Sequence, residues 1–122
     1  MNKQVLKQLK GLQPGDLIRV GWFDASIGKS RRSFIDVPAL SYGLFLGLLG
    51  DMNKHIVLCQ NSFRYTDGMY EVDYTAVPID WSVKITVIRE SEVSEQVAKE
   101  LLNSFVAGRH RTLKRRTNNH GS

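Results

Sequence analysis

Cations are the residues of this sequence whose chemistry is most readily assigned. Residues 109–116 contain five of them and no acid, namely Arg109, Arg111, Lys114, Arg115 and Arg116. Because lysine and arginine neutralise phosphates and release counterions, such a run favours contact with a nucleic acid. The rest of the chain holds 12 basic and 12 acidic side chains, so this run carries the whole net charge of +5. We expect residues 109–122 to form a flexible basic tail; contact with another anionic surface and a purely solubilising role are the alternatives.

A second basic cluster lies in the long connection between the first two predicted strands. It consists of Lys29, Arg31 and Arg32, and Phe34 follows it closely. Cations on a long loop can contact phosphates, and an aromatic ring beside them can stack on a base of a single strand. The sequence therefore predicts a nucleic-acid contact here. The alternative is a solvated loop whose Phe34 packs into the core.

A polar turn provides a third candidate surface. Asp51, Asn53, Lys54 and His55 follow an apolar segment that ends at Gly50. Amide and imidazole groups presented on a loop form hydrogen bonds with the edges of unpaired bases. This turn is therefore a candidate base-reading surface, and a solvated turn without a specific role is the alternative.

Signatures of catalysis are missing from the sequence. No His-x-x-x-His, Cys-x-x-Cys or Gly-x-Ser-x-Gly pattern occurs. The segment Gly28-Lys29-Ser30 resembles the end of a phosphate-binding loop, but Phe23 stands where that loop needs its first glycine. We expect a non-catalytic protein without cofactor or metal; an enzyme with an unfamiliar site is the alternative. Three acids in and after a predicted turn are interpreted as solvated: Asp67, Glu71 and Asp73.

The spacing of apolar residues predicts the elements that position these groups. Alternation is typical of strands, and spacings of three and four residues are typical of helices. Alternation predicts strands at 16–24, 71–77 and 81–88, and an apolar run at 56–59 predicts a strand over 54–63. A fifth strand is predicted over 39–50 from its glycines. Helical spacing predicts a short helix over 2–10 and a second helix over 91–108, which Gly108 would cap. The lone Cys59 lies in an apolar strand pattern, and we expect it to be buried.

The segment 39–50 decides the fold class. It contains glycines at 43, 47 and 50, and three glycines would cost a helix about 2–3 kcal/mol. Glycine instead allows a strand to bend sharply. We therefore predict a mainly β protein whose five strands close into a small SH3/Sm-like barrel, because closure removes exposed edges. Most aromatic side chains on the strands are expected in the core.

The predicted organisation is one domain with an appended tail. Residues 1–90 form the barrel with its N-terminal helix, 91–108 form the C-terminal helix and 109–122 the tail. No apolar run approaches the roughly 18 residues of a membrane span. Lysines at positions 3, 7 and 10 interrupt the N-terminal segment, which therefore does not fit a secretory signal. A single cysteine excludes an internal disulfide, so we expect a cytoplasmic protein without a membrane partner.

Three consecutive features resemble the first half of a known family of small barrels, and the last two carry that family's first motif. A short N-terminal helix enters a strand through Pro14-Gly15-Asp16-Leu17-Ile18-Arg19-Val20. The glycine-punctuated Gly43-Leu44-Phe45-Leu46-Gly47 comes next, and Asp51-Met52-Asn53-Lys54-His55-Ile56-Val57-Leu58 follows a turn. On these residues, the chain from 2 to about 88 resembles the Sm/LSm-like family of small barrels. The family's second motif is replaced by Val77-Pro78-Ile79-Asp80-Trp81, which resembles the 3₁₀ corner of SH3-like barrels.

The resemblance implies a function for the polar turn. In the Sm-like family this turn presents RNA-binding groups around the pore of a ring. It therefore implies an RNA site at Asp51 and His55, a preference for single-stranded RNA over DNA, and assembly into a ring or other homo-oligomer. The sequence as a whole favours a non-catalytic nucleic-acid-binding barrel protein. The alternative is a protein-interaction or assembly module that binds no nucleic acid.

Overall fold

Five strands and two helices make up the described part of the chain, which in this computed structural model comprises residues 3–24, 37–64, 70–104 and 106. In chain order the elements are α1 (Lys3–Lys10), β1 (Leu17–Asp24), β2 (Val37–Leu49), β3 (His55–Arg64), β4 (Tyr70–Pro78), the 3₁₀ turn η1 (Ile79–Trp81) and β5 (Ser82–Arg89). A helix over residues 95–104 follows. Both predicted basic clusters, residues 29–32 and the tail, lie outside the described residues.

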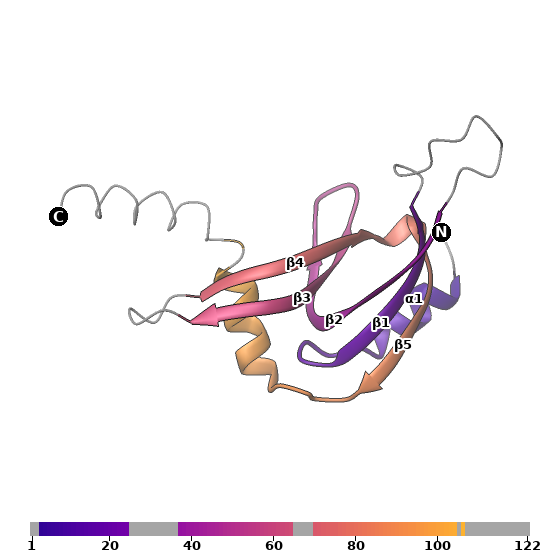
Figure 1. Ribbon diagram of the computed structural model, residues 1–122. Helices are drawn as coiled ribbons and strands as arrows, with labels where there is room; N and C mark the ends of the chain where they lie inside the picture. Colours follow the sequence, from indigo (N-terminus) through magenta and orange to yellow (C-terminus); the bar gives the residue numbers. More distant parts are fainter. Residues whose placement is uncertain (1–2, 25–36, 65–69, 105, 107–122) are drawn as a thin grey trace, which may run out of the picture.

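The strands form one antiparallel sheet with the order β4-β3-β2-β1-β5 (Figure 1). This confirms the prediction of a mainly β protein with five strands. Within the described residues, β4 and β5 are the two edge strands, and η1 joins one to the other. The predicted 3₁₀ corner is confirmed, with the correction that Trp81 belongs to it and β5 begins at Ser82.

Glycines allow the long strand β2 to pair with two different strands. Its first part pairs with β1 and its last part with β3, so the strand must change direction between them. At Gly43 a Cβ atom would lie 2.8 Å from the carbonyl oxygen of Cys59, which leaves no room for a side chain. Gly47 adopts a φ of +142°, next to an irregularity in the β2–β3 register. The prediction of a bent strand rather than a helix is therefore confirmed.

The main core fills the concave side of this sheet. Buried residues from all five strands and α1 meet there, among them Val5, Ile18, Leu58, Val77 and Ile85. Val77 lies on the edge strand β4 and Ile85 on the opposite edge strand β5, yet both belong to this one cluster. The sheet therefore curls strongly enough for its two edges to bury side chains in the same core.

A second core lies on the opposite face of β2 and β3. Leu46, Val57 and Cys59 pack there with Ala98 and Leu101 of the 95–104 helix. The helical spacing of the sequence predicted this apolar face, and the buried cysteine is likewise confirmed. Figure 1 shows this helix, in orange, beside β3 and β4.

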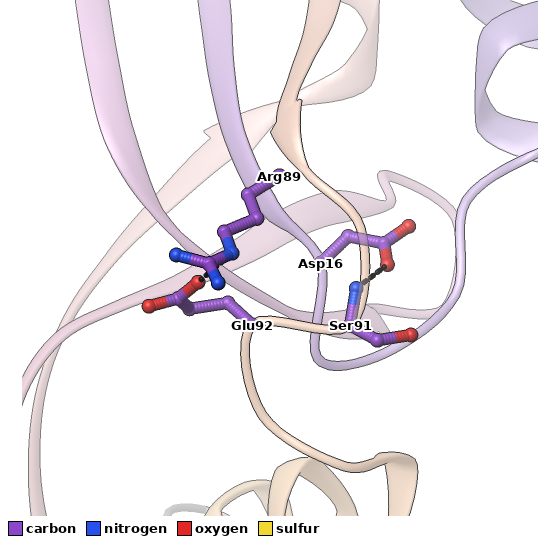
Figure 2. A network of polar contacts seen from close by, with 4 residues as sticks. All are labelled: Asp16, Arg89, Ser91 and Glu92. Carbon is purple, nitrogen blue, oxygen red and sulfur yellow. Dashed lines mark hydrogen bonds and ion pairs between the residues drawn. The ribbon is translucent and has the colours of Figure 1, made fainter.

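Asp16 ties the two halves of the fold together (Figure 2). Its side chain is buried and accepts hydrogen bonds from the backbone nitrogens of Gln13, at 3.0 Å, and Ser91, at 2.9 Å. The second bond fixes the chain between β5 and the 95–104 helix to the start of β1. An exposed ion pair between Arg89 and Glu92, at 3.1 Å, spans the same junction.

The prediction that most strand aromatics lie in the core is wrong for three side chains. Phe23, Tyr42 and Tyr74 are 42%, 47% and 44% exposed. Phe45 is buried, and Trp22 and Trp81 are half-buried. No helix within the described residues is long and apolar enough to cross a bilayer.

Candidate nucleic-acid interface

The turn between β2 and β3 is held in shape by its first residue. Gly50 adopts a φ of +120°, and a Cβ atom there would collide with the carbonyl oxygen of Asn53. A positive φ is strained for any residue with a side chain, so glycine allows the chain to reverse tightly here. The reversal leaves Asp51, Met52 and Asn53 exposed at the end of the sheet.

His55 is fixed at the end of this turn by a local hydrogen bond. Its Nδ1 lies 3.0 Å from the carbonyl oxygen of Asn53. A carbonyl oxygen can only accept, so this contact selects the imidazole form that carries hydrogen on Nδ1. In the neutral ring, Nε2 is then an acceptor. Asp51 is also an acceptor when ionised, so the two predicted RNA-contacting residues lie on one short turn and both offer acceptors.

The β4–β5 corner lies directly beside this turn. The backbone nitrogen of Ile79 donates to the carbonyl oxygen of Lys54 at 3.0 Å, and His55 pairs with Pro78 in the β3–β4 register. The Ser82 hydroxyl donates to the carbonyl oxygen of Pro78, at 3.0 Å, and closes the corner. These bonds hold the exposed carboxylate of Asp80 near the polar turn.

A tryptophan pair connects the corner to the end of β1. The rings of Trp22 and Trp81 stack with their centroids 6.2 Å apart and an interplanar angle of 14°. Trp22 also donates from Nε1 to the Ser41 hydroxyl at 2.9 Å and pairs with Ser82 in the β1–β5 register. The side chain of Trp22 is therefore held by β2 and η1 at once.

These contacts define one continuous surface, which we call the rim: residues 50–55, 78–82 and 22–24. Figure 1 shows its segments on the same upper side of the view. Asp24 and Val37 pair at this end of the sheet, so the connection that carries Lys29, Arg31 and Arg32 leaves and re-enters the described fold at the rim. The structure thus brings Asp51 and His55 together with the attachment points of the predicted loop cluster.

The rim itself carries no excess of positive charge among its described side chains. Its basic side chains, Lys54 and His55, share the turn and the corner with the acidic Asp51 and Asp80. Phosphate binding at the rim would therefore depend on cations from connected segments, whereas hydrogen-bond acceptors and aromatic rings are already present. The expectation that strand aromatics lie in the core holds for Trp22, which packs against the main core. Its stacking on Trp81 at the rim was not predicted from the sequence.

The described residues also bear on metal binding and on thiol chemistry. No three histidine, cysteine or acidic side chains among them gather as a metal site. Burial, with a smaller contribution from nearby Asp73, raises the pKa of the Cys59 thiol above its ordinary value of 9.0. Cys59 therefore stays protonated at neutral pH and is a poor nucleophile.

The resemblance to Sm-like barrels depends on sequence features and stays a prediction. No protein-family model, curated protein or solved structure matches this chain.

Proposed function

We propose that this chain is a non-catalytic nucleic-acid-binding protein built on an SH3/Sm-like barrel, with single-stranded RNA as its preferred partner. The observation that carries the proposal is the rim. There a base-reading turn and a stacked tryptophan pair lie at the point where the loop with Lys29, Arg31 and Arg32 joins the fold. Turn and loop can therefore contact bases and phosphates of the same strand.

The barrel assignment is supported by the shared core and the corner. Side chains from the edge strands β4 and β5 bury together, and η1 turns the chain between them. We include assembly of several copies in the proposal, because β4 is an edge strand of the described sheet and edge strands are sites at which sheets of different copies pair. A cytoplasmic location fits a chain whose single cysteine is a buried thiol.

The basic segments and the hydrogen-bond acceptors of the rim together favour a nucleic acid over other polyanions. Five tail cations account for the net charge, while the rim adds acceptors at Asp51 and His55. Cations bind any polyanion, whereas acceptors beside aromatic rings discriminate among unpaired bases. We therefore expect affinity to come from the basic segments and base preference from the rim.

The first prediction concerns the salt dependence of RNA binding. For the full chain and a fluorescent single-stranded RNA, we expect log affinity to fall linearly with log salt concentration, since bound cations displace counterions. Deleting residues 109–122 removes five cations, and the slope should become shallower by about 3.5 if all five contact phosphates. Fluorescence anisotropy between about 50 and 300 mM salt measures both slopes. A DNA of the same sequence is the control for the sugar, and an undiminished slope after the deletion would exclude the tail from the interface.

An assembly module is the second candidate, favoured by an apolar surface on the convex face. Leu40 is 60% exposed and pairs with Gly21, and Tyr42 is exposed opposite Arg19. Phe23 is exposed on the same face of β1. Exposed apolar side chains gathered on one face are typical of protein contacts. A chain that binds no RNA at low salt but forms stable complexes through this face would establish the second candidate instead.

A further inference from the structure

α1 and β5 enclose an open groove away from the rim. Its lining includes Gln4, Lys7 and Gln8 of α1, Leu12 just after it, and Ile85 and Val87 of β5. The groove has a volume of about 470 Å³, within the range of roughly 300–1,000 Å³ that is typical of small-molecule clefts. An apolar floor with amide groups on its wall suits a flat heterocycle that carries hydrogen-bonding groups on its edge.

The orientation of one amide in this groove is fixed by the backbone. The nitrogen of Ile85 donates to Oε1 of Gln8 at 2.8 Å. Only the oxygen end of the amide can accept that bond, so the NH₂ end remains available to donate. Gln8 therefore presents a donor in the groove, and this donor fits a carbonyl oxygen or a ring nitrogen of a base.

Three lysines form a stripe along the exposed side of the same helix. Lys3, Lys7 and Lys10 are all exposed, and their spacing of four and three residues places them on one face. None of the three forms an ion pair with an acidic side chain of the described residues. α1 has no acid in its first turn. The stripe is therefore a line of unneutralised cations that borders the groove at Lys7.

Helix stability does not account for this stripe. Like charges four residues apart repel each other, and a cation in the first turn opposes the helix dipole, so Lys3 is unfavourable on both grounds. Lys7 and Lys10 lie in the last turn, where the dipole favours them. A line of cations that includes an unfavourable member points to an external anion.

Burial of the apolar face of α1 identifies the class of anion. Val5 is fully buried in the main core and Leu9 packs against it, so this helix cannot insert an apolar face into a bilayer as membrane-surface helices do. Regularly spaced cations beside an open groove with ample room for a base match a polymer with regularly spaced phosphates and bases. We propose that the α1–β5 groove is a second nucleic-acid contact, in which Lys3, Lys7 and Lys10 bind phosphates and one base lies against Leu12 and Val87 with Gln8 donating to its edge.

This inference rests on the proposed function, and charge variants test it. Neutralising the stripe with Lys3→Gln, Lys7→Gln and Lys10→Gln together should make the slope of log affinity against log salt shallower by about 2 for single-stranded RNA. The matched control is Lys84→Gln, which removes an exposed cation beside Ile85 on the other face of β5. For single variants we expect Lys7→Gln to weaken binding and Lys84→Gln to leave it unchanged. Because the lysines are exposed, the thermal midpoint should not fall, which excludes misfolding as the cause.

A second variant tests the groove separately from the charge. Gln8→Glu keeps an acceptor for the Ile85 nitrogen but removes the donor, and we expect RNA binding about 3- to 10-fold weaker. Gln96→Glu makes the same charge change at an exposed site on the 95–104 helix and should have a smaller effect. Equal losses in these two variants would overturn the base contact.

Three outcomes separate this inference from the proposed function. If the wild-type chain binds RNA and the triple variant has the same salt slope as wild type, the second contact is overturned and the rim proposal is unaffected. Wild-type chain that binds no RNA at low salt overturns both. The third outcome concerns an oligoglutamate with the same charge as the RNA. If it competes as strongly as RNA, and the lysine variants weaken its binding as much as they weaken RNA binding, the stripe is a general polyanion surface. That result would overturn the assignment to nucleic acid.

Discussion

Removing the eight cations of the loop and the tail is expected to make the slope of log RNA affinity against log salt concentration shallower by about 5.6, and to weaken RNA binding strongly at low salt. The variant combines Lys29→Gln, Arg31→Gln and Arg32→Gln with deletion of residues 109–122. Those segments supply three and five cations, while the described rim carries acids as well as bases. Each cation that contacts a phosphate of a single strand contributes about 0.7 to the salt slope, so eight of them dominate the affinity.

The salt slope that remains in this variant tests the proposed phosphate contacts of α1. If the three lysines of α1 bind phosphates as proposed, a slope of about −2 should survive. Anisotropy titrations of wild type and variant at several salt concentrations give both numbers. The control replaces Lys54 alone, because this rim cation lies among acids and should change the slope by well under the roughly 0.7 of a full phosphate contact. A variant that keeps wild-type affinity would contradict an electrostatic role for both segments.

Gly50→Ala is expected to cause the largest loss of stability among substitutions at the rim. The left-handed φ of +120° disfavours alanine, and the new Cβ would collide with the carbonyl oxygen of Asn53 in the same turn. Strain of this kind with a backbone clash costs about 2–4 kcal/mol of unfolding free energy. Because Asp51 and His55 lie on the displaced turn, RNA binding should also weaken at temperatures where the variant is folded.

Gly11→Ala is the matched control for this substitution. A Cβ at Gly11 would meet only the carbonyl oxygen of Gln8, at an ordinary contact distance of 3.7 Å. We expect its unfolding free energy to lie within about 1 kcal/mol of wild type. Denaturant unfolding of both variants provides the comparison of stability, and RNA titration is reserved for Gly50→Ala because Gly11 lines the α1–β5 groove. Equal stability of Gly50→Ala and wild type would mean that the turn does not have the described conformation.

The strands could be predicted because burial leaves a period of two in the sequence. Alternation located β1, β4 and β5 well, and a continuous apolar run, Ile56 to Cys59, located β3, which is buried on both faces. The glycines of β2 indicated a bend that Gly43 and Gly47 indeed allow. The 95–104 helix was predictable for the same reason, because its buried Ala98 and Leu101 leave a spacing of three to four residues. In these elements, the residues that the apolar spacing marks as inward-facing are the ones that the fold buries.

Other features depend on partners that the local sequence does not indicate. Alternation shows that Tyr42 and Leu44 share a face, but not that the C-terminal helix covers Leu44 and leaves Tyr42 exposed. The role of Asp16 in holding residue 91 depends on a contact between positions far apart in the chain. For the same reason the stacked tryptophans of the rim, from β1 and η1, could not be predicted to meet.

The most direct test of the central claim is the mass of the full chain in solution, with and without a mixed-sequence single-stranded RNA. Light scattering coupled to size exclusion at low salt measures both and also gives the number of copies per particle. We predict a particle whose mass increases by that of bound RNA and which loses that RNA when the salt concentration is raised. A mass that RNA leaves unchanged at low salt would contradict the proposal that this is a nucleic-acid-binding protein.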